Sequence, residues 1–341
     1  NLSQGFPDFE VDPKLLDLCD RFAREGHNQY APMAGAPAFK QVLCELSNQQ
    51  HGSEYQPEGE ICITAGATQG IATALATVLR EGDEVILFSP AYDSYIPMIE
   101  LYGGSPITVK LSPEDYSIDW DQVKKVLNHR TRMIILNTPH NPSGSVWSDE
   151  DFKQLSDIVA DSKIMLLADE VYEHIVFNGA QHRSVRAYPT LRERAFVVGS
   201  LGKTVHVTGW KVGYVQAPEE LMREFYKVHQ FLVFSVNHPV QLALAEYLKD
   251  HDLASVGRFY EAKQRKLEQL LLEKTALKPL PTYGSYFQLV QYGHLSDLGD
   301  QACAEWLVKE IGVATIPLSP FYRDPTDHKV LRLCFAKNDQ T

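Results

Sequence analysis

The chain has 341 residues, of which 44% are hydrophobic and 22% charged, as in ordinary globular proteins. Its net charge of -12 argues against nucleic acid and anionic membranes as partners, because both attract clusters of lysine and arginine. The length favours two or three domains, and no apolar run approaches the ~20 residues of a membrane span.

The amino-terminal part is predicted to begin with two helices. Leucines at helical spacing predict one from Pro13 to Glu25, and a second amphipathic helix follows from about Ala38 to Gln50. From residue 60 onward, short apolar strands alternate with helices. The strands are expected at Ile61–Thr64, Val85–Phe88, Met133–Leu136, Ile164–Ala168 and Ala195–Val198. This alternation predicts an α/β fold with a mostly parallel sheet.

The pattern changes in the last third of the chain. Helices are expected at about Pro218–Phe231, Pro239–Lys249 and Asp252–Leu272, then near Asp300–Ile311, with a strand at Val330–Phe335. We interpret this tail as part of a second, smaller unit that also includes the amino-terminal segment. The predicted division is a large domain at 28–250 and a small domain formed by 1–27 and 251–341.

Polar segments follow three of the predicted strands. The first strand leads into Gly66-Ala67-Thr68-Gln69 at a helix start, where free backbone N–H groups favour an anion. The third leads into the two-proline turn Asn137–Gly144, and the fourth into Asp169-Glu170-Val171-Tyr172. Because ligands of such sheets bind beyond the carboxyl ends of the strands, we expect one cleft to collect these residues.

The segment from Ser200 to Gly213 places Lys203 in a glycine-flanked turn after a strand. Desolvation there would lower the lysine pKa and make its amine a nucleophile for a carbonyl, although an ordinary surface loop is an equal alternative on local chemistry. Ser200 and Lys211 are suited to one phosphate. A P-loop is excluded, because that motif needs a glycine where Val197 stands.

The cysteines and histidines form no disulfide or metal-ligand pattern. The five cysteines are odd in number and widely spaced, and the twelve histidines show no His-Glu-x-x-His spacing. Nothing at the amino end resembles a signal peptide. We therefore expect reduced thiols, no metal site and a cytoplasmic protein.

Three segments resemble motifs of one family, in the order that the family has them. Asn137–Gly144 resembles its Asn-x-Pro-x-Asn-Pro-x-Gly turn, Ala168–Tyr172 its Asp-Glu-x-Tyr segment, and Ser200–Gly213 its lysine segment. The chain thus resembles pyridoxal-phosphate-dependent aminotransferases of fold type I, class I, over nearly its whole length. The resemblance implies a large domain with a mostly parallel sheet flanked by helices, plus a smaller α/β domain.

The resemblance also implies a catalytic role for Lys203, Asp169 and Tyr172. Lys203 would bind pyridoxal phosphate as a Schiff base and later act as general acid and base, and Asp169 would sit against the pyridine nitrogen. Tyr172 and Asn141 would hydrogen-bond the cofactor O3′, and Tyr92 would stack on its ring. Out of context, Asp169 would be interpreted as a helix N-cap and Asn141 as a turn residue.

Further residues match the binding positions of the family. The phosphate would be held by Ala67, Thr68, Ser200 and Lys211. Tyr30 would reach the phosphate of the neighbouring subunit, which implies a homodimer with shared active sites. Arg332, a lone arginine in an apolar strand, would bind the substrate α-carboxylate together with Asn141 and the backbone of Gly5.

Within the family, the runs Gly5–Phe9, His27–Met33 and Ser89–Tyr95 look most like bacterial methionine aminotransferases and kynurenine (glutamine-type) aminotransferases. This predicts ping-pong transfer of an amino group from methionine, an aromatic amino acid, kynurenine or glutamine to a 2-oxo acid. Phe6, Phe9 and Tyr55 are the expected side-chain pocket. The alternative is a carbon–sulfur β-lyase acting on cystathionine or cysteine conjugates; a ligand-sensing regulator domain is disfavoured, because no basic DNA-binding segment is present.

Overall fold

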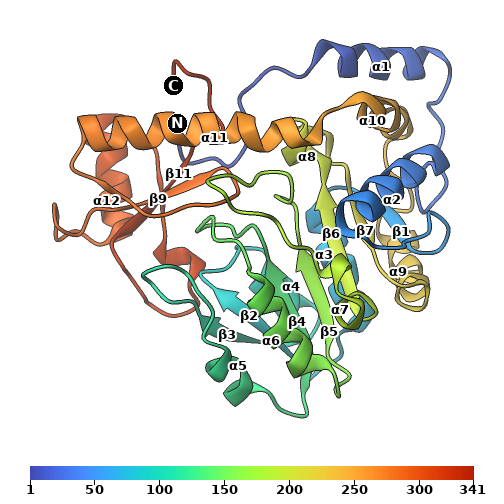
Figure 1. Ribbon diagram of the computed structural model, residues 1–341, viewed down its shortest axis with the longest axis horizontal. Helices are drawn as coiled ribbons and strands as arrows, with labels where there is room; N and C mark the ends of the chain where they lie inside the picture. The colour runs from blue at the N-terminus through green and yellow to red at the C-terminus, as the bar shows by residue number, and fades with distance from the viewer.

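The computed structural model describes residues 1–341 and contains two β-sheets (Figure 1). The larger sheet has seven strands in the order β1-β7-β6-β5-β4-β2-β3. Their bounds are β1 Ile61–Thr64, β2 Glu84–Ser89, β3 Ser105–Lys110, β4 Thr131–Asn137, β5 Met165–Asp169, β6 Ala195–Ser200 and β7 Gly213–Gln216. Only β7 is reversed, because it pairs antiparallel with both β1 and β6 while the other pairs are parallel. The carboxyl ends of β1 to β6 therefore share one edge, and β7 begins there.

Helices cover both faces of the larger sheet, which explains its nearly continuous apolar strands. In β4, Ile134 and Leu136 pack with Phe152, whereas Met133 and Ile135 face the opposite core with Leu75. The helices are α1 Pro13–Arg24, α2 Pro37–His51, α3 Ala67–Val78, α4 Tyr95–Leu101, α5 Trp120–Val126, α6 Asp149–Val159, α7 Pro189–Arg192, α8 Leu201–Thr204, α9 Glu219–Leu232, α10 His238–Asp250, α11 Leu253–Lys274 and α12 Asp300–Trp306. None combines the length and hydrophobicity needed to cross a membrane.

The smaller sheet has four antiparallel strands in the order β10-β11-β9-β8. They span β8 Lys278–Pro279, β9 Phe287–Gln291, β10 Ile316–Pro317 and β11 Val330–Cys334. Figure 1 shows the long helix α11 crossing beside this sheet. Each sheet lies inside one of the two predicted domains, and the domain boundaries themselves stay a prediction.

The amino-terminal segment runs along the smaller sheet before α1 begins. The backbone of Leu2 donates to Ala314 and accepts from Cys334, and Asp8 donates to the carbonyl of Ala336. Helix α1 then packs on α10, where the Leu15 side chain joins a shared core. The first eight residues are thereby held close to β11.

The predicted element boundaries are close to the observed ones, with two differences that matter for the site. Strands β5 and β6 extend to Asp169 and Ser200, so both residues are the last of their strands. Lys203 lies in the one-turn helix α8 and not in an open glycine turn. The helix expected to end at Ile311 changes to a π-helical turn after Trp306.

Candidate active site

A cavity of about 540 Å³ lies at the carboxyl edge of the larger sheet and is bounded on its other side by the smaller sheet. Every residue predicted to bind the cofactor or the α-carboxylate lines this cavity except Tyr30. Those lining it are Gly5, Ala67, Thr68, Tyr92, Asn141, Asp169, Tyr172, Ser200, Lys203, Lys211 and Arg332. The parallel arrangement explains this convergence, because the segments after β1, β4, β5 and β6 meet at one edge.

The Lys203 amine is partly buried and points toward Tyr286 and Gly5. Its Nζ donates to the Tyr286 hydroxyl at 3.0 Å and is 3.5 Å from the Gly5 carbonyl oxygen. Burial lowers the pKa of Lys203 to about 8, although the Asp169 carboxylate opposes the shift. About a tenth of the amine is therefore unprotonated at pH 7, far more than for an ordinary lysine, and the unprotonated form is the nucleophile for a carbonyl.

The Asp169 carboxylate is buried at the end of β5. Tyr95 Oη donates to Oδ2 at 2.5 Å, and the backbone of Val171 donates to Oδ1 at 3.3 Å. Burial raises the Asp169 pKa to about 6, against the opposing effect of the Tyr95 hydrogen bond. A buried carboxylate of this kind gains by facing a cationic group in the cavity.

The start of α3 offers backbone donors to the cavity. The N-cap Gly66 has φ 77° and no side chain to cap the first turn, so the N–H groups of that turn are available to an anion. A Cβ on Gly66 would lie 3.2 Å from Lys211 Nζ, and one on Gly213 would lie 2.7 Å from Ala67 N. The two glycines thus allow Lys211 and the start of α3 to approach one another.

Arg332 extends from β11 across the cavity to Asn141. Its Nη1 donates to Asn141 Oδ1 at 2.8 Å, while its guanidinium carbon lies 4.0 Å from the Phe287 ring centroid. The Nε of Arg332 is buried and has no partner. Asn137 braces the turn, since its side chain accepts from Asn141 N and donates to Asp169 O.

Two tyrosines predicted for the site differ in burial. Tyr172 is buried with its ring 5.1 Å from that of Tyr286, and burial raises its pKa. Tyr92 is partly exposed at the cavity wall and contacts Tyr95 edge to face. Tyr30, by contrast, is 80% exposed and lies against Phe234 away from the cavity of its own chain.

The expected side-chain pocket of Phe6, Phe9 and Tyr55 is wrong for this cavity, because none of the three lines it. Phe9 packs on Phe259, and Tyr55 is buried in a core beneath α2. The apolar lining beside Arg332 comes instead from Phe287 and from the segment that begins with β10. That segment contributes Ile316, Pro317, Pro320 and Phe321.

Sequence reasoning also missed the hydroxyls of Tyr95 and Tyr286. Tyr95 lies in the run Ser89–Tyr95, from which only Tyr92 was selected. Tyr286 directly precedes β9 in an apolar stretch that is typical of a core strand. Neither position carries a local signal for a polar contact, since the partners are 74 residues away for Tyr95 and 83 and 281 residues away for Tyr286.

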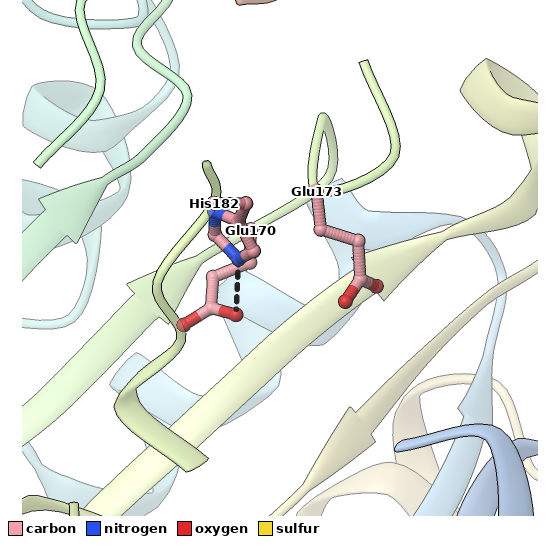
Figure 2. Close-up of side chains that lie close together, drawn as sticks. All are labelled: Glu170, Glu173 and His182. Atoms are coloured by element: carbon pink, nitrogen blue, oxygen red, sulfur yellow. Dashed lines mark hydrogen bonds and ion pairs between the residues drawn. The ribbon is translucent and has the colours of Figure 1, made fainter. Parts of the chain in front are cut away.

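Behind Asp169 and Tyr172 lies a buried ionic cluster, defined as Glu170, Glu173, His182 and Arg186. Figure 2 shows the two glutamates and His182, with His182 Nε2 hydrogen-bonded to Glu170 at 3.1 Å. The Arg186 Nη1 lies 3.2 Å from Glu170 and 2.7 Å from Glu173. Carboxylates and an imidazole in this arrangement are metal-ligand types, but here the guanidinium already supplies their positive charge.

The donor set of the cavity fits pyridoxal phosphate. An uncapped helix start with Lys211 and Ser200 suits the phosphate, and the buried Asp169 suits a protonated ring nitrogen. Lys203 has the lowered pKa needed to bond with the aldehyde. The fold and the cavity together fit a pyridoxal-phosphate enzyme.

The comparisons agree with this geometry. The family model for aminotransferases of class I and II matches residues 1–341. Methionine aminotransferase of Escherichia coli is 47% identical, covering 100% of this chain and 89% of that protein. Human kynurenine–oxoglutarate transaminase 1 is 32% identical with the same coverage. A crystal structure of an E. coli protein with a methionine aminotransferase function has a TM-score of 0.97 at 46% identity and covers 100% of this chain and 89% of its own.

The chain belongs to the class I and II aminotransferase family. It is a pyridoxal-phosphate-dependent amino acid aminotransferase that uses amino acids and 2-oxo acids as substrates, and its fold is that of the fold type I enzymes.

Proposed function

We propose that the protein transfers the amino group of methionine and other large neutral amino acids to a 2-oxo acid in a ping-pong reaction. The observation that carries this proposal is the apolar lining beside Arg332. The cations of the cavity are Lys203, Lys211 and Arg332, and the exposed Asp93 also lines it. A second substrate carboxylate would therefore meet apolar groups and a negative charge. Similarity to methionine and kynurenine aminotransferases supports the same substrate class.

When bound, pyridoxal phosphate supplies a ring that accepts electrons from the substrate Cα. Asp169 would hold the proton on the ring nitrogen, and the Lys203 amine would remove and return the proton at Cα. Tyr172 and Asn141 would donate to the O3′ oxygen, and Tyr92 would fix the plane of the ring by stacking.

Binding of the substrate and of the phosphate would use separate groups. Arg332 would donate two hydrogen bonds to the α-carboxylate, with Asn141 and the Gly5 backbone beside it. At the other end of the cavity, the backbone of Ala67 and Thr68 and the side chains of Ser200 and Lys211 would hold the phosphate. The substrate carboxylate and the phosphate would thus be held by separate sets of residues.

Reduction with borohydride is expected to fix the cofactor covalently on Lys203, because its amine has a lowered pKa inside the cavity. Peptide mapping by mass spectrometry locates the label, and Lys203→Ala should abolish it. Lys211→Ala serves as the matched control, since it should weaken phosphate binding and leave the label on Lys203. A label on any other lysine would refute the assignment.

Substrate preference tests the proposed function directly. Methionine and phenylalanine should exceed aspartate in kcat/KM by at least ~10²-fold with one common 2-oxo acid, a difference of ~2.7 kcal/mol in transition-state binding. Pyruvate and ammonia formed without an acceptor are measured in the same assay, because they would report β-elimination. Equal or better activity with aspartate would mean that a second cation reaches the pocket, and the proposal would fail.

We also propose a homodimer with shared active sites. Its support is a patch of exposed apolar side chains at Tyr30 and the end of α9, defined as Tyr30, Phe231, Leu232 and Phe234. Phe231 is 85% exposed, which is unusual for an aromatic side chain of this size in a free monomer. In a dimer, Tyr30 would reach the phosphate in the neighbouring cavity.

Sedimentation is therefore expected to show two chains per particle. Tyr30→Phe should leave the dimer intact but speed cofactor loss on dialysis, since only the hydroxyl to the phosphate is removed. Tyr283→Phe, which alters another tyrosine that is 45% exposed, is the control and should retain cofactor like the unaltered protein. A fully active monomer would contradict this proposal.

We further propose a cytoplasmic location and the division into a large domain at 28–250 and a small domain at 1–27 and 251–341. All five cysteines are unpaired, which supports a reducing compartment. The separation into two sheets supports the two domains.

A further inference from the structure

Tyr286 is a buried tyrosine whose ring lies in an aromatic core and whose hydroxyl lies at the edge of that core. Its ring packs among Tyr172, Tyr260 and Phe287, where a phenylalanine would serve as well. Its Oη, however, lies 2.6 Å from the Gly5 carbonyl oxygen and 3.0 Å from Lys203 Nζ. The neighbouring Tyr260 shows the contrast, because its buried hydroxyl has no partner.

The direction of these two hydrogen bonds follows from the chemistry of the groups. A carbonyl oxygen only accepts, so Tyr286 uses its single proton on Gly5. The Lys203 amine must then donate, and the tyrosine oxygen accepts from it. The hydroxyl is therefore oriented to hold Lys203 and favours the protonated form of the amine.

The backbone around Tyr286 is held in place from several directions. Ser285, with φ 61°, donates to Ile175 O, and Phe335 donates to Tyr286 O. Gly284 donates to the carbonyl of Gly144 at the end of the Asn137–Gly144 turn. The hydroxyl is thus fixed relative to both sheets, as a group that positions another must be.

The Gly5 carbonyl is equally constrained. The carbonyl of Ser3 accepts from Arg332, and that of Phe6 accepts from Lys337. A Cβ on Gly5 would lie 2.7 Å from the Phe287 ring, so the backbone passes directly over β9. The amine of Lys203 therefore rests between two fixed oxygens.

We propose that Tyr286 is a positioning residue for Lys203: oriented by the Gly5 carbonyl, its hydroxyl holds the lysine amine whenever that amine is free. The inference rests on the proposed role of Lys203 as the cofactor lysine. An amine released by the substrate must stay beside the cavity to move the proton at Cα, and its four-carbon stem is otherwise free to turn. The Tyr286 hydroxyl supplies a defined resting place.

The test compares Tyr286→Phe with Tyr260→Phe, which removes a partnerless hydroxyl from the same aromatic core. In the protein stripped of cofactor, competitive labelling of lysines with acetic anhydride at a series of pH values gives the titration midpoint of Lys203. Loss of an acceptor disfavours the ammonium form, so in Tyr286→Phe the midpoint should fall by about half to one pH unit. Tyr260→Phe should keep the midpoint of the unaltered protein. The other charged or titratable groups around the amine are Asp169, Tyr172, Lys211, Arg332 and Cys334, and both variants retain them.

In the loaded enzyme, Tyr286→Phe should lower kcat of the half-reaction with methionine about tenfold while KM changes little. An unchanged Lys203 midpoint in Tyr286→Phe would overturn the proposal, as would the same shift in Tyr260→Phe. Should Tyr286→Phe fold poorly, the titration midpoint of Lys203 is measured in a chain with residues 1–5 deleted. Without the Gly5 carbonyl, the Tyr286 proton is free to turn toward the amine. The midpoint of Lys203 should then also fall. Borohydride labelling of Lys203 fails only if the proposed function is wrong. A wrong assignment of Tyr286 is therefore distinguishable from a wrong assignment of Lys203.

Discussion

Asp169→Asn is expected to retain cofactor and to lose at least ~10³ in turnover, the scale of ~4 kcal/mol of transition-state stabilisation. This change does not alter Lys203 or the residues that would bind the phosphate, so the cofactor should remain bound. The amide carries no negative charge to keep a proton on the ring nitrogen, which removes the main reason for electrons to leave the substrate Cα. Single-turnover kinetics with methionine, followed by absorbance, measure the loss.

Asp93→Asn is the matched control, because it removes a carboxylate from the same cavity at an exposed position. Its effect on turnover should be far smaller, since solvent screens the charge. Near-normal turnover in Asp169→Asn would show that the buried carboxylate has no role at the ring nitrogen. Loss of cofactor from that variant would instead assign Asp169 to binding.

Arg186→Met should lower the free energy of unfolding by about 3–5 kcal/mol, because it leaves two buried carboxylates without a cation. Glu170 and Glu173 directly follow Asp169 and Tyr172, so the same change should loosen the segment that presents both residues to the cavity. Urea unfolding of the holoenzyme measures the loss. Arg183→Met is the control: its ion pair with Asp149 is exposed and should contribute less than about 1 kcal/mol.

The contribution of Arg186 should depend on pH in a defined direction. Burial is the largest effect and would raise the pKa of Glu170 and Glu173, but Arg186 acts together with the neighbouring histidines and holds both below their ordinary value of 4.5. Stability from groups with lowered pKa is fully present above that value and is lost as the pH falls through the folded pKa. The difference between the unaltered protein and Arg186→Met should therefore shrink below pH 4.5. A difference that grows on acidification would contradict the assignment.

The part of the site that was predictable from the sequence lies at strand ends. Asn141, Asp169 and Lys203 follow apolar runs in motifs with fixed spacing, and a parallel sheet has only one edge at which such segments meet. The resemblance to the family motifs was enough to select these residues, and each is positioned by the strand before it.

The part that was not predictable depends on contacts between distant segments. Tyr286 reaches Gly5 across 281 positions and Tyr95 reaches Asp169 across 74, and neither tyrosine has a local polar pattern. Phe9 was assigned to the side-chain pocket from the family resemblance, yet its ring packs on Phe259 of α11. The reversed direction of β7 likewise follows from pairing with β1 and β6 and not from its own residues.

The distance along the chain between Gly5 and Arg332 has a consequence for biosynthesis. Gly5 is synthesised long before its contacts, because its carbonyl is held by Tyr286 and that of the nearby Ser3 by Arg332. The groups assigned to the phosphate and to the ring nitrogen are all translated by residue 211, so the larger sheet can assemble around them first. The groups for the cofactor can therefore assemble before the chain contains Arg332, so capture of the cofactor can precede binding of the amino acid carboxylate.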